Sequence, residues 1–180
     1  MLNKILTYGT IAGLIVGAST FATAFLWSGA PSAIGMVIGF TIMLIAFSAI
    51  FIAVKRQRDK EGGGVIRFWP ALGLGLGISV VASLFYVIGW EASLALSDTD
   101  FMGVYTAQMI EQKRAAGASA AELARYTAEM QEFRRQYQDP LYRMPITFTE
   151  IFPVGVLVSL VSAALLRNPR FLSARRPASI

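Results

Sequence analysis

The sequence predicts an all-α protein: a four-helix transmembrane bundle with an extracytoplasmic helical hairpin between the third and fourth membrane helices. Three observations lead to this fold. Of the 180 residues, 55% are hydrophobic and only 15% are charged, whereas a soluble domain carries about a quarter charged residues. Four apolar runs are each long enough to cross a hydrocarbon core about 30 Å thick. One long polar segment separates the third run from the fourth.

The four apolar runs contain no lysine or arginine and cover residues 5–27, 33–54, 71–90 and 146–166. Because loop backbone in lipid would leave polar groups unsatisfied, each run is expected to form one continuous helix. The first run, with Lys4 before it, resembles a cleavable secretory signal. It is longer than the apolar region of a signal, which has about 7 to 15 residues, so we interpret it as a retained helix.

Lysine and arginine are sorted strongly between the two sides of the predicted bundle. The side with both termini carries ten basic and two acidic residues, a net charge of +8, and the other side carries six basic and nine acidic residues. Cytoplasmic flanks are rich in lysine and arginine, so both termini are expected in the cytoplasm. Trp27 and Trp90 are expected at the outer membrane boundary, and Phe68 and Trp69 at the inner one. The pI of about 9.8 therefore indicates topology, and no nucleic-acid partner is expected.

The polar segment before the fourth run is expected to be helical over about residues 98–139. Asp98 or Thr99 can cap a first helix, and a capping box at Ser119 and Glu122 opens a second. Apolar side chains recur at three- and four-residue steps on both helices, which favours a hairpin. The alternative is that each helix lies flat on the bilayer. The side chains of this seam on the second helix are Leu123, Tyr126, Met130, Phe133 and Tyr137, and the narrower match on the first is Phe101, Tyr105, Gln108 or Met109, and Gln112.

Small residues recur at four-residue spacing in every predicted membrane helix. Helices in lipid gain little from hydrophobicity against one another, so close approach through small residues matters more. We expect these stripes to pack within the chain, and contact between copies of the chain is the alternative. The stripes are Gly9, Gly13 and Gly17; Gly35 and Gly39; Gly73 and Gly77; and Gly155, Ser159 and Ala163.

The chain contains no cysteine and no histidine. This excludes disulfides, zinc fingers, cysteine nucleophiles and Ser-His-Asp triads. Carboxylates are the only strong acid–base or metal-binding groups that remain. We expect no cofactor and no enzymatic activity, because no pair of nucleophile and base stands out among the apolar runs.

Glu91 and Glu150 are the candidate functional residues, because acidic side chains in a membrane are costly. Glu150 lies about five residues inside the fourth run, on the helix face opposite Ser159. Its expected partner is Arg143, Tyr86 or a basic residue of the hairpin. One interpretation is an ion pair or hydrogen bond that anchors the hairpin to the bundle. The other is a paired carboxylate site for a proton or a divalent cation, although two carboxylates alone make a weak metal site.

Several short motifs are distributed from the first apolar run to Arg167. They are Lys55 to Lys60 with its Arg58-Asp59-Lys60, then Gly64, Ile66 and Phe68, then Tyr86-Val87-Ile88-Gly89-Trp90-Glu91, Gly117-Ala118-Ser119-Ala120, Asp139-Pro140-Leu141 and Thr149-Glu150-Ile151-Phe152-Pro153-Val154-Gly155. Together these motifs resemble the bacterial membrane family named domain of unknown function 4199. The resemblance implies a small multi-pass inner-membrane protein and assigns it no reaction.

We therefore expect residues 1–167 to form a four-span membrane domain and residues 168–180 to be a disordered cytoplasmic tail. The expected function is that of a non-enzymatic accessory or interaction protein of a bacterial inner membrane. Its expected partners are the lipid bilayer and a protein or second copy, bound through the small-residue stripes or the hairpin. The alternative function is a small transporter or channel component that uses Glu91 and Glu150.

A topology reporter fused after Asp100 is expected to be active on the periplasmic side, because basic residues concentrate on the side of the termini. A fusion at the C-terminus is the matched control and is expected to report the cytoplasm. Cytoplasmic activity of the Asp100 fusion would overturn the orientation.

Overall fold

A computed structural model of the chain describes residues 1–26, 33–97 and 100–173. These ranges contain helices and no strand. Four of the helices are long and apolar enough to cross a membrane, which confirms the all-helical prediction with four candidate spans. The helices are α1 (Leu2–Leu26), α2 (Ala33–Lys60), α3 (Phe68–Leu96), α4 (Phe101–Ala115), α5 (Ala120–Tyr137) and α6 (Pro140–Leu166).

The long helices extend past the predicted spans by up to about two turns. α3 begins at Phe68 and ends at Leu96. α6 begins at Pro140, directly after its N-cap residue Asp139. Pro145 and Pro153 both lie inside α6. The predicted spans include only the apolar residues, whereas a helix continues until its terminal backbone groups find other partners. The polar ends of the helices therefore lie outside the predicted spans. Trp27, a predicted boundary residue, lies outside the described residues.

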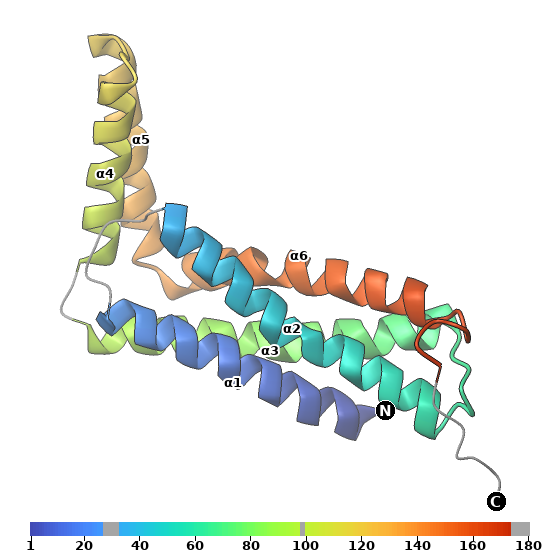
Figure 1. Cartoon of the computed structure of the whole chain (residues 1–180). Helices are drawn as coiled ribbons and strands as arrows, with labels where there is room; N and C mark the ends of the chain where they lie inside the picture. The colour runs from blue at the N-terminus through green and yellow to red at the C-terminus, as the bar shows by residue number, and fades with distance from the viewer. Residues whose placement is uncertain (27–32, 98–99, 174–180) are drawn as a thin grey trace, which may run out of the picture.

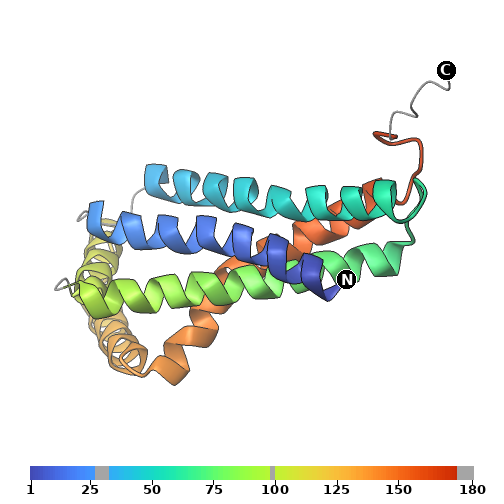
Figure 2. The same ribbon diagram turned by 90° about the horizontal axis from the view of Figure 1, so that it is seen from below.

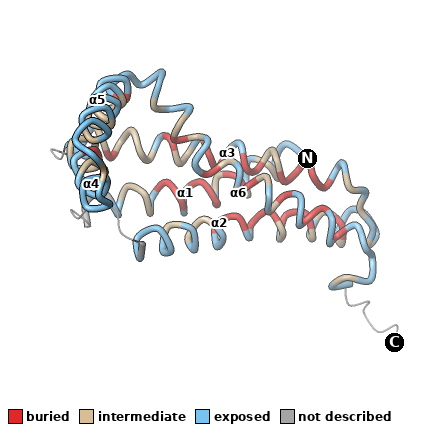
Figure 3. The backbone as a smooth tube through the Cα atoms, turned by 90° about the horizontal axis from the view of Figure 1, so that it is seen from above, coloured by how far each residue is buried: buried red, intermediate tan, exposed pale blue. Residues whose placement is uncertain are grey.

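α3 is the central helix of the bundle. It makes its most extensive contacts with α1 and α6, and α2 packs against α1, α3 and α6. Figures 1 and 2 show the four long helices side by side, with α4 and α5 at the end of the bundle opposite Met1. Figure 3 shows that burial concentrates where α1, α2, α3 and α6 face one another. We call the opposite end, where α1 starts and α2 and α6 end, the basic end.

Glycines bring the backbones of α1 and α3 into contact. A Cβ atom added at Gly17 would lie 2.8 Å from the carbonyl oxygen of Phe85, and one added at Gly89 would lie 2.6 Å from the carbonyl oxygen of Gly17. Gly9 and Gly13 face α3 equally closely. Contacts at these distances leave no room for a methyl group. The predicted packing within the chain is confirmed for the stripe of α1.

Small residues also join α3 to α6. Ser79 Oγ lies 3.2 Å from Ser159 Oγ, and each hydroxyl also donates to the carbonyl oxygen four residues earlier on its own helix. Cβ atoms added at Gly75 and Gly155 would each collide with the serine of the other helix. On α2, in contrast, nothing lies within 4 Å of a Cβ added at Gly39. The prediction that this glycine packs within the chain is wrong, because no neighbouring helix comes within contact distance of it.

α4 and α5 lie side by side and run crosswise to the four long helices, as Figure 1 shows. The capping box at Ser119 and Glu122 is confirmed, and its hydrogen bonds lower the pKa of Glu122 below the usual value. The cap of α4 is Asp100, whose side chain accepts from the Gly103 amide at 2.8 Å. Asp98 and Thr99, the caps expected from the sequence, lie outside the described residues.

Gly17→Ala is expected to lower the free energy of unfolding by about 1–3 kcal/mol, because the added methyl group must displace backbone atoms of α3. Gly39→Ala is the matched control. It meets open space, so it is expected to leave stability unchanged or raise it slightly through helix propensity. Thermal unfolding of the full chain in detergent measures both, and equal losses would contradict the assigned packing.

Candidate functional site

Two of the polar side chains singled out in the sequence, Glu91 and Arg143, lie where α3, α5 and α6 meet. Trp90 and Glu91 lie near the end of α3, Tyr137 ends α5, and Arg143 lies in the first turn of α6. We call these four residues the junction. The chain turns sharply between α5 and α6. The Asp139 side chain caps α6 by accepting from the Leu141 amide at 2.9 Å, and Pro140 is the first residue of α6.

Arg143 of α6 binds both α3 and the turn between α5 and α6. Its Nε donates to Glu91 Oε1 at 2.7 Å and its Nη2 donates to Oε2 at 2.5 Å, which is a two-bond contact with the carboxylate. Its Nη1 donates to the Gln138 carbonyl oxygen at 2.9 Å. The Arg143 and Glu91 side chains are only 16% and 20% exposed, so loss of either would leave a charge that water solvates poorly.

Aromatic contacts extend the junction toward α4. Trp90 Nε1 donates to the Tyr137 hydroxyl at 2.9 Å. The Trp90 and Phe101 rings meet edge to face, with their centroids 4.8 Å apart. Tyr137 is buried, and this burial raises the pKa of its phenol. The hydroxyl therefore stays protonated and continues to accept from Trp90 at any physiological pH.

Glu150 lies deeper along the bundle, beside Tyr86. The Tyr86 hydroxyl donates to Glu150 Oε2 at 3.3 Å. Tyr86 comes five residues before Glu91 on α3, so this contact lies about 7 Å from the junction along the helix axis. Glu150 is exposed on the surface of α6 while Ser159 is buried, as expected from their opposite positions around the helix.

The four candidate residues thus form two separate pairs, Glu91 with Arg143 and Tyr86 with Glu150. Of the partners expected for Glu150, Tyr86 lies beside it, and Arg143 is engaged elsewhere. Among the described residues, no ion pair includes Glu150. The same part of the chain contains no cluster of three or more acidic side chains that could ligate a metal ion.

Arg58 has a structural role that was not predicted from the sequence, where it was expected only as a basic flanking residue and as part of a family motif. It is fully buried at the basic end. Its Nη1 and Nη2 donate to the carbonyl oxygens of Phe171 and Leu172 at 2.7 and 2.8 Å, and its Nε donates to Asp59 at 2.7 Å. The Arg58-Asp59 pair within the family motif was the available signal.

The same bonds place the first part of the C-terminal tail. The backbone after α6 turns back over the end of α2, and the Phe171 ring meets the Phe51 ring edge to face. Residues 174–180, the rest of the tail expected to be disordered, lie outside the described residues.

The fold and the junction define an all-helical protein with four candidate membrane spans and a polar helical pair attached at one end. The chain belongs to the family described as "Protein of unknown function (DUF4199)", which it matches over residues 7–168. This match confirms the family resemblance and covers both the junction and Arg58. No curated protein and no solved structure matches the chain.

Arg143→Gln is expected to lower the free energy of unfolding by about 2 kcal/mol, because it leaves the Glu91 carboxylate half-buried without its partner. Glu91→Gln added to it is expected to cost less than the sum of the single changes, since the two side chains interact directly. Arg135→Gln, which breaks an exposed pair with Glu132, is the control with little expected effect. Additive losses in thermal unfolding would contradict the ion pair.

Proposed function

We propose that the chain is a multi-pass protein of a bacterial inner membrane, with both termini in the cytoplasm, and that it acts as a non-enzymatic accessory or interaction protein. Four candidate spans support membrane insertion. The excess of lysine and arginine on the side of the termini supports the orientation. The bacterial inner membrane is what the family resemblance implies.

The single observation that carries this proposal is that the polar side chains of the junction bind one another across helices. Glu91 and Arg143 bind each other across α3 and α6, and Trp90 binds Tyr137 of α5. These bonds attach the α4–α5 pair to the bundle, which is the arrangement that a protein needs to present a surface at a membrane. A carboxylate engaged in this way is poorly suited to carry a proton or an ion.

We further propose that α4 and α5 form an extracytoplasmic hairpin that lies along the outer membrane surface. Their direction crosswise to the long helices supports this, because spans that cross the bilayer put a crosswise element in the plane of the membrane (Figure 1). The pair carries exposed ion pairs, Arg114 with Glu111 and Arg135 with Glu132. Such a solvated surface suits a protein partner, while the glycines of α1 and α3 are occupied within the chain.

The second candidate function is a transporter or channel component, and Glu150 is the observation that favours it. Its carboxylate lies about 7 Å further along the bundle than Glu91, on an exposed surface, with the Tyr86 hydroxyl as its hydrogen-bond donor. Acidic side chains at such depth commonly serve ion or proton pathways. The accessory function and this one therefore make different predictions for Glu150.

A photocrosslinking amino acid in place of Arg125, an 82% exposed side chain on α5, is expected to capture a protein in native membranes. The same group in place of Val37, which is exposed on the apolar surface of α2, is the control and is expected to capture lipid. Glu91→Gln with Arg143→Gln is expected to reduce the protein adduct more than the amount of the chain in the membrane, because the hairpin loses one of its attachments while that of Trp90 to Tyr137 remains.

Glu150→Gln decides between the two functions in the same cells. The accessory function predicts that the adduct and the abundance of the chain stay unchanged. Loss of a pH- or cation-dependent flux at normal abundance would overturn that function and support transport.

A further inference from the structure

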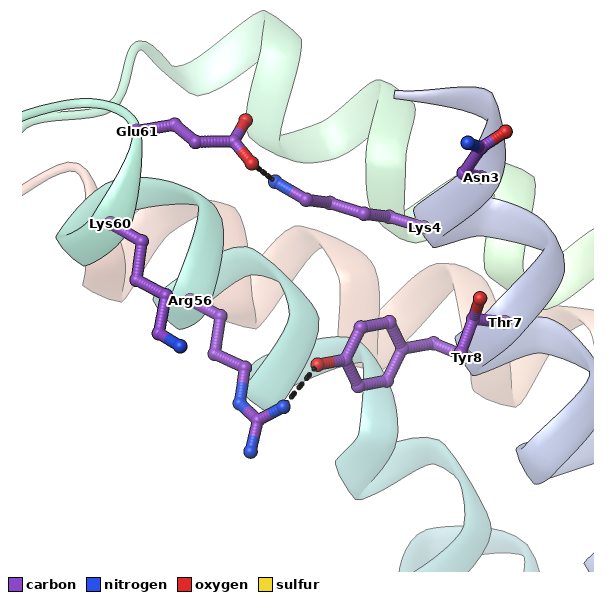
Figure 4. Close-up of a pocket in the computed structure, with 7 residues that line it drawn as sticks. All are labelled: Asn3, Lys4, Thr7, Tyr8, Arg56, Lys60 and Glu61. Atoms are coloured by element: carbon purple, nitrogen blue, oxygen red, sulfur yellow. Dashed lines mark hydrogen bonds and ion pairs between the residues drawn. The ribbon is translucent and has the colours of Figure 1, made fainter.

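A polar groove lies between the start of α1 and the end of α2, at the basic end of the bundle (Figure 4). Its volume is about 260 Å³. Figure 4 shows Arg56 and Lys60 leaving the same side of α2, with Tyr8 reaching across from α1. The lining residues are Asn3, Lys4, Thr7, Tyr8, Arg56, Lys60 and Glu61.

The groove carries two positive charges that no acidic side chain neutralises. Lys4 pairs with Glu61, and this hydrogen bond lowers the pKa of Glu61, so the carboxylate stays ionised at neutral pH. Arg56 Nη1 donates to the neutral Tyr8 hydroxyl at 3.0 Å. Within the described part of the chain, Lys60 has no hydrogen-bond or ion-pair partner.

The other acid on this side of the bundle does not reach the groove. Asp59 accepts from Lys55 Nζ at 2.5 Å and from Arg58 Nε at 2.7 Å. Arg58 is buried and engaged with the chain beyond α6. The uncompensated cations of Arg56 and Lys60 therefore remain available to an external anion that also finds the Tyr8 and Thr7 hydroxyls nearby.

Exposed apolar side chains lie beyond the groove on both helices, toward the middle of the bundle. On α2, Ile52 and Ile45 precede Arg56 by four and eleven residues, which places them on the same helix face, and both are exposed. On α1, Ile11 and Leu14 follow Thr7 in the same way. Both helices are candidate spans, and that of α2 ends at Lys60. A cationic site at the end of a span and an apolar surface along it match a molecule with an anionic head and hydrocarbon chains.

We propose that this groove binds an anionic phospholipid, with the headgroup phosphate at Arg56 and Lys60 and the acyl chains along Ile52 and Ile11. Arginine matches phosphate oxygens with two parallel donors, and lysine adds a point charge. A free phosphate is the poorer occupant, because Arg56 and Lys60 are exposed and salt screens an open site. The proposal rests on the proposed membrane insertion of the four spans, and on nothing else in the proposed function.

The test is binding of dioleoyl phosphatidylglycerol to the purified full chain in a non-ionic detergent, followed by native mass spectrometry. Arg56→Gln with Lys60→Gln is expected to weaken binding about 30-fold, from about 1 kcal/mol per basic residue. Arg167→Gln with Arg170→Gln removes two exposed charges at the same end of the bundle, outside the groove, and is the matched control. It is expected to change the affinity less than about twofold.

Three results would overturn the proposal. Equal weakening by the control variant would show general attraction to the basic end rather than a site. Equal binding of dioleoyl phosphatidylcholine would show that the anionic charge is not recognised. Saturation of the groove by inorganic phosphate at the same concentration would assign it to a soluble anion.

Lys60→Gln alone keeps the test decisive if the double variant unfolds, because the Lys60 side chain has no partner within the described residues. It is expected to weaken binding about fivefold. Lipid binding in detergent requires neither a membrane orientation nor a partner protein. If the lipid does not bind, the results of the topology and crosslinking experiments are unaffected. Those experiments can fail in turn without changing the lipid affinity.

Discussion

The close approach of α3 to α1 and α6 governs how the bundle and the junction are arranged. In lipid, apolar side chains gain little by leaving their surroundings, so helices associate where their backbones can come near. Gly17 and Gly89 bring α1 against α3, and the serine and glycine pairs of α3 and α6 do the same on the other side. The contacts of α1 with α3 involve backbone atoms, and those of α3 with α6 place a glycine of each helix against a serine of the other, so both sets fix how far each helix lies along its neighbour. That register places Glu91 opposite Arg143 and Tyr86 opposite Glu150.

Three arginines show how position in the bundle decides what the same side chain does. Arg58 is fully buried and binds backbone carbonyl oxygens after α6, so it stabilises the return of the chain over α2. Arg143 is partly buried, binds a carboxylate with two bonds and attaches the α4–α5 pair. Arg56 is exposed, binds only a neutral hydroxyl, and keeps its charge available for an external anion. The first two arginines stabilise the fold, whereas the third leaves the basic end with charge to recognise a ligand.

Much of the fold could be predicted because the signals are local. The apolar runs, the capping box at Ser119 and the opposite faces of Glu150 and Ser159 each depend on residues within a few helical turns. The role of Arg58 could not be predicted in this way, since its acceptors lie more than a hundred residues further along the chain. The open surroundings of Gly39 were missed for the same reason: its spacing matches the other stripes, and only the direction of α2 separates it from a neighbour.

Four properties follow from the sequence alone: the number of long apolar helices, the polar segment between the last two, the asymmetry of charge and the family. These follow from composition and from spacing along one helix, where physical neighbours are sequence neighbours. The partners of the arginines come from the packing of the helices: Arg143 binds Glu91 rather than Glu150, and Arg56 and Lys60 share a groove with Tyr8. Arg143 and Glu150 are about 10 Å apart along α6, while Glu91 reaches Arg143 from the neighbouring helix. Partners between helices depend on which backbones pack closely and in what register, and no single helix contains that information.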